Sequence, residues 1–582
     1  MLKECLEVFE EILRESGGKK VVDTYIPADG TYLIVGKDGN IKENVEIVKD
    51  KKTKEIDRNQ SGFKEVCFYD YQSQLISMNK PIDPKKVIHS NSYLSFFVKK
   101  DSIVSGKLTE AVIDGYYGIL ENPGEKKYKK SREAFKIYER FEKEEGKVNI
   151  EAVRKNASWI KTHIFRLEDV DLKRKDYLKI FFEAEDTEYE REGRRYFLPN
   201  IYNNNEYNAE INGVVYGMPD NNLGMNAKKP FLSIKSRKYP APYLLDGDGV
   251  ILQKQFFDYL MNLVSSGKYQ VYVDTERKKI SGYANGDAPD HVESGYYFRI
   301  RKGKTEAEIY DQDIIPGYQR KLSVPFCFKN YLGCEHEHKP EYKERYQIYD
   351  DRLAVGKVID EVFFSKFLGN NYTVDAGEIS IKDEILKQNI LFSRDAISAW
   401  VFKGTDNGIE KILDKAGMKM IKSSALQDYR EKVFWQFNLR WSLRDYFSKE
   451  KGENMGEIIT EIRNTVEMKV LSAETVPVEN DREYYYCVGQ LAGYLISLSK
   501  AKDKKQSLIS PLLNAKTDEE IKRRLLQLYK KYNYSIPEGY KRVKNLLAMV
   551  EGYVPDGMVD QEMVILGYTC DNVIYKVVSN EL

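Results

Sequence analysis

Two charged residues stand at the spacing of a metal-dependent nuclease site. Glu276 and Lys278 lie in the string VYVDTERKK with one residue between them, as in the Glu-x-Lys half of such a site. A nuclease of this kind needs further carboxylates to hold its metal ion, so Asp248 or Asp258 would have to converge on the pair. A charged hairpin turn explains the same residues. We therefore assign no catalytic residue and keep a metal-dependent nuclease as an alternative.

A second group of side chains has the chemistry of zinc ligands. The string CFKNYLGCEHEHK contains Cys327, Cys334, His336 and His338, and thiolate and imidazole both bind zinc well. The spacing of the two cysteines does not match the common zinc-finger spacings, and neither does the spacing of the His-x-His pair. We therefore predict no metal site, and zinc binding by these four residues stays an open alternative.

The remaining catalytic signatures are weak or missing from the sequence. Asp-Gly-Asp-Gly at 246–249 resembles a fragment of a calcium loop but lacks the later ligands, and Asp-Gly pairs are common in turns. The sequence holds no P-loop, GxSxG, HExxH or paired-glycine nucleotide motif. Its five histidines are dispersed, at positions 89, 163, 291, 336 and 338. The sequence thus favours a protein that is not an enzyme and needs no cofactor.

One segment without acids has the composition of a nucleic-acid contact. From Asn221 to Leu244 there is no Asp or Glu, and three prolines restrict the backbone and lower the ordering cost of binding. Its cations attract phosphates, and its asparagines offer paired donor and acceptor groups to base edges. The predicted DNA-binding residues here are Asn221, Asn222, Asn226, Lys228, Lys229, Lys235, Arg237 and Lys238. A solvated surface loop is the alternative.

A second basic run lies near the C-terminus. Residues 498–532 carry ten Lys or Arg and four acids. Exposed helical faces are normally charged, so a solvated face is the alternative here. The predicted DNA-binding residues in this run are Lys504, Lys505, Arg523 and Arg524. A third cluster, KKYKKSR at 126–132, is expected to be a solvated linker.

The elements that position these segments change in kind along the chain. Residues 20–50 alternate like a hairpin, 107–121 and 250–266 have helical patterns, and 268–330 return to strand character. Beyond about residue 345 the pattern is helical, with a regular stripe at Ile458, Ile462, Val466 and Val470 and prolines at 477, 511, 537 and 555 marking boundaries. We predict an α+β protein: a mixed α/β region at 1–345, a helical connecting region at 346–425 and an all-helical C-terminal bundle at 426–582.

Composition bounds the class of protein without deciding its function. The 582 residues are 42% apolar, enough for a sizeable core, and 92 Lys plus Arg balance 91 Asp plus Glu. Six scattered cysteines do not suggest a secreted disulfide scaffold. The start, MLKECLEVFEEILRE, is typical of an amphipathic helix, and no segment approaches the ~20 apolar residues of a membrane span. We expect a cytoplasmic protein without a membrane partner.

Several strings resemble the large subunit of the type I-B CRISPR surveillance complex, Cascade. They are YIPADGTYLIV at 25–35, the segment 69–100 that ends in SYLSFFVKK, YGMPDNNLGMNAKKPF at 216–231, and GQLAGYLISLSKAKDKKQSLISPLLNAK at 489–516. The basic string at 216–231 is the most distinctive, and the last string is similar to the small-subunit-like helical region of the family. The middle third of the chain is poorly covered.

The resemblance implies a subunit of an RNA-guided antiviral complex that is not itself an enzyme. Guide pairing would read the target while this subunit recognises the protospacer-adjacent motif (PAM), stabilises the opened DNA and serves as the platform for a helicase-nuclease. Its partners would be target double-stranded DNA, the helicase-nuclease and the crRNA-containing Cascade subunits, namely the backbone, handle-binding and small subunits. Two other classes stay open, a metal-dependent defence nuclease and a purely structural assembly subunit.

Met455 is a candidate internal start. Related type I complexes as a family produce the C-terminal bundle as a separate small subunit. Met455 is expected to lie in a loop between two helices, so a product from Met455 onward would keep all later helices whole. An ordinary Met in a surface loop is the alternative.

Overall fold

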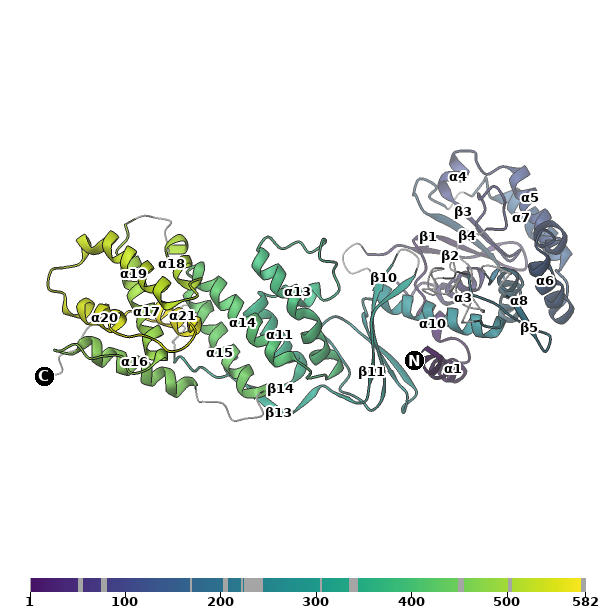
Figure 1. Ribbon diagram of the computed structural model, residues 1–582. Helices are drawn as coiled ribbons and strands as arrows, with labels where there is room; N and C mark the ends of the chain where they lie inside the picture. The colour runs from purple at the N-terminus through teal and green to yellow at the C-terminus, as the bar shows by residue number, and fades with distance from the viewer. Residues whose placement is uncertain are drawn as a thin grey trace. The chain divides into compact units, whose positions relative to one another are not determined.

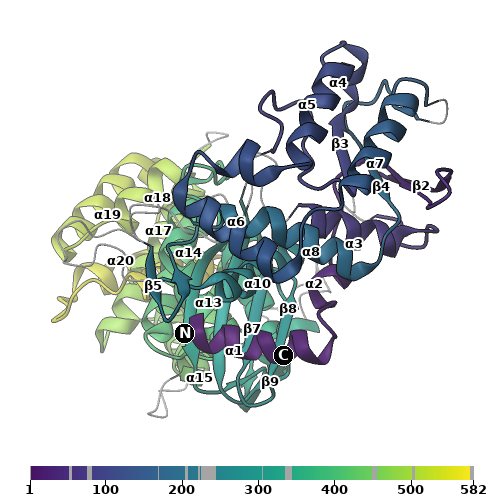
Figure 2. The same cartoon turned by 90° about the vertical axis from the view of Figure 1, so that its right-hand side faces the viewer.

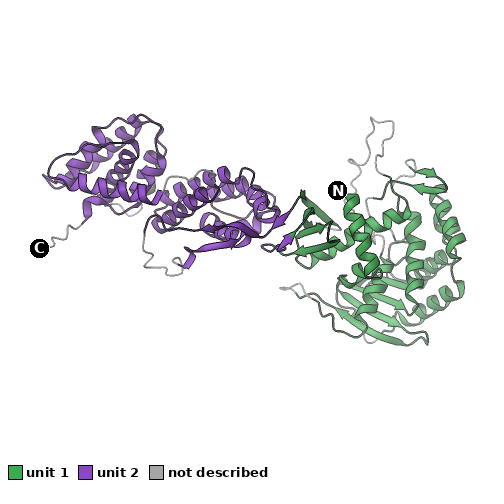
Figure 3. Ribbon diagram, turned by 90° about the horizontal axis from the view of Figure 1, so that it is seen from below, with its two compact units in different colours: residues 1–285, 292–316 green, residues 286–291, 317–582 purple. Residues whose placement is uncertain are grey.

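The computed structural model describes residues 2–50, 56–74, 81–167, 170–202, 208–220, 223, 244–303, 306–333, 344–447, 455–500 and 505–576. The chain forms two compact units (Figure 3). Unit 1 comprises Met1–Asn285 and Val292–Pro316, and unit 2 comprises Gly286–His291 and Gly317–Leu582. The N-terminal region is mixed α/β and the C-terminal region is helical, which confirms the predicted α+β class. The boundary between the two units lies near residue 316. The boundary predicted from the sequence, between the mixed α/β region and the helical region, lies at residue 345.

Unit 1 contains a four-stranded mixed sheet in the order β2-β1-β4-β3. Its strands are β1 (Gly30–Val35), β2 (Ile41–Ile47), β3 (Ser95–Lys99) and β4 (Tyr177–Phe182). β1 pairs antiparallel with β2 and parallel with β4, and β3 pairs antiparallel with β4. All six residues of β1 are buried, as expected for a central strand that is covered on both faces.

Alternating side chains of β4 meet helices on opposite faces of this sheet. Figures 1 and 2 show the ribbons of the sheet and of the helices beside it. Phe182 packs edge-on against Trp159 of α7 (Ile150–His163). Phe181 packs against Tyr69 of α3 (Phe63–Ser73). On the α3 face the ammonium of Lys179 lies 2.6 Å from the carboxylate of Asp70, with both side chains fully buried. Burial lowers the pKa of Lys179 and Asp70 opposes that shift.

A second, antiparallel sheet in unit 1 has the order β11-β10-β7-β8. Its strands are β7 (Gln270–Asp274), β8 (Lys279–Tyr283), β10 (Gly295–Lys302) and β11 (Ala307–Ile315). Helix α10 (Gly247–Ser265) packs on it, and α1 (Leu2–Glu15) packs on α10 through Phe9, whose ring meets Phe256. The amphipathic first helix is confirmed, because Leu6, Phe9 and Leu13 are buried.

The other elements of unit 1 are helices and one short strand pair. They are α2 (Lys20–Asp23), α4 (Lys100–Val104), α5 (Glu110–Leu120), the π-helix η1 (Gly124–Tyr128), α6 (Arg132–Glu145), α8 (Asp186–Phe197), the 3-10 helix η2 (Leu198–Asn200), β5 (Ala209–Ile211) and β6 (Val214–Tyr216). Short strands β9 (His291–Val292) and β12 (Tyr318–Gln319) lie where the chain passes between the units.

Unit 2 begins with the β13–β14 hairpin and continues as helices (Figure 1). Its elements are β13 (Lys321–Cys327), β14 (Ile348–Asp351), α11 (Arg352–Phe364), α12 (Leu368–Asn371), α13 (Glu384–Ser398), the π-helix η6 (Ala399–Lys403), α14 (Ile409–Leu426), α15 (Arg430–Phe447), α16 (Met455–Leu471), α17 (Asp481–Ser497), α18 (Lys505–Leu513), α19 (Asp518–Tyr532), η7 (Asn533–Ser535), α20 (Lys541–Glu551), α21 (Gln561–Thr569) and η8 (Val573–Tyr575). Every element described after residue 426 is helical.

One hydrophobic core joins the helices from α14 to α21. It includes Ile421 of α14 and Trp441 of α15 together with Leu491 of α17 and Leu566 of α21. Helix α17 is buried along most of its length, and α17 and α21 form the most extensive helix pair. The bundle therefore shares its core with α14 and α15.

Three local expectations are corrected. Val21 and Val22 belong to the single helical turn α2, so the predicted hairpin at 20–50 is limited to β1 and β2. Pro511 lies inside α18 and marks no boundary. Tyr128, in the expected solvated linker, is buried in η1. No helix within the described ranges is long and apolar enough to cross a membrane.

Candidate nucleic-acid interface

The two ends of the acid-free basic segment are joined in unit 1. Gly217, just before it, and Leu245, just after it, form an isolated antiparallel bridge. The amide of Gly217 donates to the carbonyl of Leu245 at 2.9 Å, and the amide of Leu245 donates back at 3.0 Å. Gly217 and Leu245, which flank the segment in the sequence, therefore lie side by side, and we call this pair the stem.

The hydroxyl of Tyr202 lies across this stem. It is 2.9 Å from the carbonyl oxygen of Val215 and 2.9 Å from that of Leu245, so it holds both sides. Tyr202 also forms a bridge with Pro219, and the amide of Asp220 donates to the carbonyl of Ile201 at 2.7 Å. Burial raises the pKa of Tyr202 well above its ordinary value. The hydroxyl therefore keeps its proton and remains a donor.

Glycine is required at position 217. A Cβ there would lie 2.4 Å from the ring of Tyr202 and 2.5 Å from the side-chain oxygen of Asn208, closer than non-bonded atoms approach. Six residues further on, Leu223 is buried in the core of unit 1, and its amide donates to the carbonyl of Asp220 at 3.1 Å. The segment is thus anchored at Leu223 as well as at the stem.

The predicted contacts within this segment lie outside the described residues. They are Asn221, Asn222, Asn226, Lys228, Lys229, Lys235, Arg237 and Lys238. Lys504 also lies outside them, and Lys505 begins α18 with its side chain not described. Of the predicted contacts, Arg523 and Arg524 are described with their side chains.

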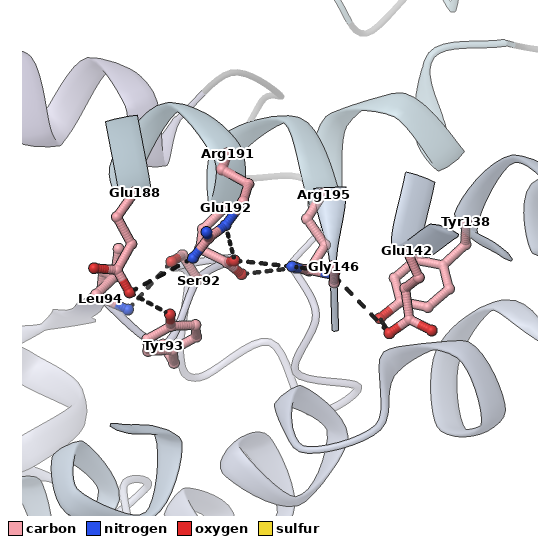
Figure 4. Close-up of polar contacts among 10 residues, drawn as sticks. All are labelled: Ser92, Tyr93, Leu94, Tyr138, Glu142, Gly146, Glu188, Arg191, Glu192 and Arg195. Atoms are coloured by element: carbon pink, nitrogen blue, oxygen red, sulfur yellow. Dashed lines mark hydrogen bonds and ion pairs between the residues drawn. The ribbon is translucent and has the colours of Figure 1, made fainter. Parts of the chain in front are cut away.

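A buried ionic network fixes helix α8, which leads into Tyr202 (Figure 4). The guanidinium of Arg195 donates to both carboxylate oxygens of Glu192, at 2.8 and 3.1 Å, and to the carbonyl of Gly146 at 3.0 Å. It also lies 3.9 Å from the carboxylate of Glu142 on α6, which accepts a hydrogen bond from Tyr138 at 2.8 Å. The network therefore ties α8 to α6.

Other members of the network tie α8 to the first sheet. The hydroxyl of Tyr93, just before β3, donates to Glu188 at 2.7 Å, and Arg191 lies between Glu188 and Glu192. The side chains of Arg195 and Glu192 are 5% and 3% exposed. Burial opposes the charge of Arg195, but Glu192 and Tyr138 outweigh it and raise its pKa. This charged pair is structural, since each of its members is committed to neighbours.

Helix α19 presents cations on its outer face. Ile521, Leu525, Leu528 and Tyr532 form its buried stripe, at the spacing of an amphipathic helix. The side chain of Thr517 caps its first turn, which is acidic, and Lys530 and Lys531 lie in its last turn, so both ends suit the helix dipole. Within the described ranges no carboxylate pairs with the exposed Arg523 and Lys530 or with the half-buried Arg524.

Three of the four residues of the possible nuclease site have other partners. Lys278 occupies the β7–β8 turn with a φ of +49° and pairs with Glu11 at 3.6 Å. Both carboxylate oxygens of Asp258 accept from Lys254 at 2.7 Å, and one accepts from Tyr71. Asp248 pairs with Arg194 at 3.4 Å. The charged hairpin turn is therefore the better interpretation of Glu276 and Lys278.

The other two motifs are resolved in part. Asp246 of the Asp-Gly-Asp-Gly string is the N-cap of α10 and accepts from the amide of Gly249 at 2.8 Å. Cys327 ends β13, while Cys334, His336 and His338 lie outside the described residues. Among the described residues, no three His, Cys, Asp or Glu side chains gather as a metal site would require.

The chain matches no family model, no curated protein and no solved structure.

Sequence patterns missed the stem and the α8 network. Gly217 and Leu245 pair across the whole basic segment, and this long-range contact has no local spacing. The isolated Gly217 was the available signal within the string 216–231. A glycine in a strand often marks a close approach of other atoms.

Proposed function

We propose that this chain is the large subunit of a type I-B CRISPR surveillance complex. In this role it recognises the protospacer-adjacent motif beside the target, holds opened DNA and recruits a helicase-nuclease, while a guide RNA reads the target sequence. The chain itself performs no chemistry in this proposal.

The observation that carries the proposal is the anchored basic segment. Residues 221–244 contain five cations and no acid, and the flanking chain is joined at the stem by Gly217 and Leu245. Because the chain is held at the stem and at Leu223, binding through this segment would cost less freedom than binding through a free tail, which favours contacts to base edges as well as to phosphates.

Helix α19 supports the second part of the proposal, the holding of opened DNA. Its outer face carries Arg523, Arg524, Lys530 and Lys531 on a helix whose other face is buried. Unpaired cations at regular helical spacing suit contacts to phosphates that do not depend on sequence. The contact would follow a displaced single strand.

A simple assay distinguishes the proposed subunit from the alternative, a metal-dependent defence nuclease. Purified protein incubated with DNA or RNA and Mg²⁺ or Mn²⁺ is expected to leave both intact, and Glu276→Ala is expected to leave interference in the host unchanged. Cleavage by the wild type that is abolished by Glu276→Ala would replace the proposal with the nuclease.

Co-purification tests the proposal directly. A tagged chain expressed from its native host is expected to bring down a guide RNA together with the backbone and handle-binding subunits. Recovery without RNA or partner subunits would overturn the proposal. Recovery of the complex with unchanged DNA binding by loop variants would instead favour a purely structural assembly subunit.

The internal start at Met455 stays part of the proposal with one change. Met455 is the first residue of α16 and not a loop residue, so a short product would begin directly with a helix. Such a product would uncover the surfaces of α18 and α21 that contact α14, and copies could bury these surfaces against one another. A C-terminal tag is expected to reveal the product, and Met455→Leu with synonymous recoding of 451–454 is expected to remove it. A host that makes no short product would rule the internal start out.

A further inference from the structure

A cavity of about 600 Å³ lies in unit 2 between the end of α11 and the start of α15. Helices α11, α14 and α15 pack on one another (Figure 1), and the cavity is lined by residues of α11, of α15 and of the turn between α14 and α15. Its lining combines ionic side chains with two aromatic residues, Tyr429 and Trp435. Tyr429 is 54% exposed, whereas Trp435 is buried beneath the guanidinium of Arg345, 5.2 Å from its ring centroid. Tyr429 is therefore the aromatic surface that a ligand can reach.

The backbone around this cavity is unusual. Six non-glycine residues of the described chain have a positive φ, and three of them, Ser365, Lys366 and Asp428, line this cavity. All three lie at helix ends, where glycine normally takes the left-handed conformation at lower cost. Elsewhere in unit 2, Gly404 and Gly408 occupy such positions. Side chains are thus kept at the cavity where glycine would be more stable, a pattern associated with functional sites.

Among the described residues, the charges at the cavity leave one cation without an acidic partner. Glu361 is held by Arg345 and by Lys366 at 3.1 Å, and Asp428 lies 3.8 Å from Arg430. Glu431 is the third carboxylate of the lining. With Arg345 included, four cations face three carboxylates.

Lys432 is the unpaired cation of this lining. Its ammonium donates to the hydroxyl of Ser365 at 2.9 Å, and within the described ranges no carboxylate lies at ion-pair distance from it. Burial lowers its pKa, while the charge of Asp383 acts in the opposite direction. A half-buried ammonium with an uncharged neighbour can accept an anion and regain the solvation that it lacks.

We propose that this cavity binds one nucleotide, with its phosphate on Lys432 and Arg430 and its base against Tyr429. A base has a flat face that stacks on tyrosine, and a phosphate matches an ammonium beside a guanidinium. The nucleotide can belong to a single strand or be a free mononucleotide, because the chemistry of recognition is the same. The site differs from the α19 face, whose proposed contacts are all cations.

The experiment measures binding of deoxyadenosine monophosphate and of a short single-stranded DNA with one 2-aminopurine to the full chain. Arg523, Arg524, Lys530 and Lys531 are replaced by Ala in all proteins to remove the α19 face. Lys432→Met is expected to weaken binding by about tenfold, the usual cost of losing a charged hydrogen bond. Tyr429→Ala is expected to weaken it by roughly fivefold or more and to remove the quenching of 2-aminopurine by stacking.

Ser365→Gly and Asp428→Gly separate a ligand site from an ordinary helix end. Each is expected to raise the melting temperature of unit 2, by about 2–4 °C for each kcal/mol of relieved strain. Ser365→Gly is expected to weaken nucleotide binding because Lys432 loses its hydroxyl partner, whereas Asp428→Gly is expected to strengthen it because Arg430 loses a competing carboxylate. Lys86→Gly is the matched control, because Lys86 has a φ of +56° in unit 1. It is expected to leave nucleotide binding unchanged.

The two probes distinguish a free mononucleotide from a nucleotide within a single strand as the ligand of the cavity. Comparable affinity for the monophosphate and the strand indicates a free mononucleotide, and binding of the strand alone indicates a nucleotide within single-stranded DNA; either result supports the site. Absence of binding to both, or binding that Lys432→Met and Tyr429→Ala do not change, overturns it. Because the monophosphate assay needs no guide RNA or partner subunit, its failure is distinguishable from failure of the proposed function.

Discussion

The two cationic regions of this protein are built in different ways. In unit 1 the cations lie in a segment whose base is set by Tyr202, Gly217 and Leu245, and Tyr202 in turn follows a helix fixed by buried charges. In unit 2 the cations Arg523 and Lys530 lie on one continuous helix with its own cap and buried stripe.

This difference shows what each region can be expected to do. A loop held at a defined base can bring particular side chains to particular base edges, and such a contact is lost when the base is disturbed. A helix face offers charges at regular spacing and needs no distant support. Binding through the basic segment is therefore expected to respond to buried changes elsewhere in unit 1, and binding through the α19 face is expected to respond mainly to changes in α19 itself.

The largest expected effect comes from breaking the buried network. Arg195→Met leaves the carboxylate of Glu192 buried without its main partner, and such changes cost about 3–5 kcal/mol. Urea unfolding of the full chain, with a separate probe for each unit, is expected to show unit 1 destabilised and unit 2 unchanged. DNA binding through the loop is expected to weaken although no loop cation is removed.

Arg191→Met is the matched control on the same helix. Arg191 also contacts Glu192, at 3.3 Å, but its side chain is 35% exposed, so its loss is expected to cost about 1 kcal/mol or less. Equal destabilisation by the two variants would contradict the role given to Arg195.

A smaller effect is expected from Tyr202→Phe. The change removes one hydroxyl that holds two carbonyls, with a cost of about 1–3 kcal/mol, and loosens the stem. The affinity of the loop for duplex DNA is expected to fall while its salt dependence stays the same, because the number of phosphate contacts does not change. Tyr216→Phe is the control, since the Tyr216 hydroxyl makes no hydrogen bond to any described residue. A Tyr202→Phe protein that binds DNA like the control would show that the stem does not position the loop.

The smallest effect on stability is expected on α19. Alanine at Arg523, Arg524, Lys530 and Lys531 changes an outer helix face, so the free energy of unfolding is expected to move by about 0.5 kcal/mol or less per substitution. Binding of single-stranded DNA is expected to lose about 2.8 units of log–log salt slope, at ~0.7 per phosphate contact. Titrations at several salt concentrations measure this change. An unaltered slope would remove α19 from the proposed path of the strand.

Local patterns predicted the elements that depend on a single stretch of sequence. The i, i+4 stripe of α16 and the buried face of α1 follow directly from apolar spacing. The same rules do not indicate the burial of α8, because seven of its twelve residues are charged and a charged helix suggests solvent. Arg195 and Glu192 are nevertheless buried, since each neutralises the other within a hydrogen-bonded network.

Long-range contacts account for the rest. The composition of 221–244 predicts its chemistry, but the joining of its two ends at Gly217 and Leu245 depends on residues far apart in the sequence. The cavity beside Lys432 likewise depends on α11, α14 and α15 meeting, and its left-handed residues Ser365 and Asp428 carry no glycine signal. Sequence spacing cannot indicate contacts between residues that lie far apart in the chain.

The most direct test of the central claim is the salt dependence of target-duplex binding by the assembled complex. Replacing Lys228, Lys229, Arg237 and Lys238 with Ala is expected to lower the log–log slope by about 3.6 units, at ~0.9 per phosphate, and to weaken binding at every salt concentration. Alanine at Lys126, Lys129, Lys130 and Arg132 is the control with equal charge, and it is expected to leave the slope unchanged. An unchanged slope and affinity in the loop variant, or equal losses in the control, would contradict the assignment of this loop as the DNA contact.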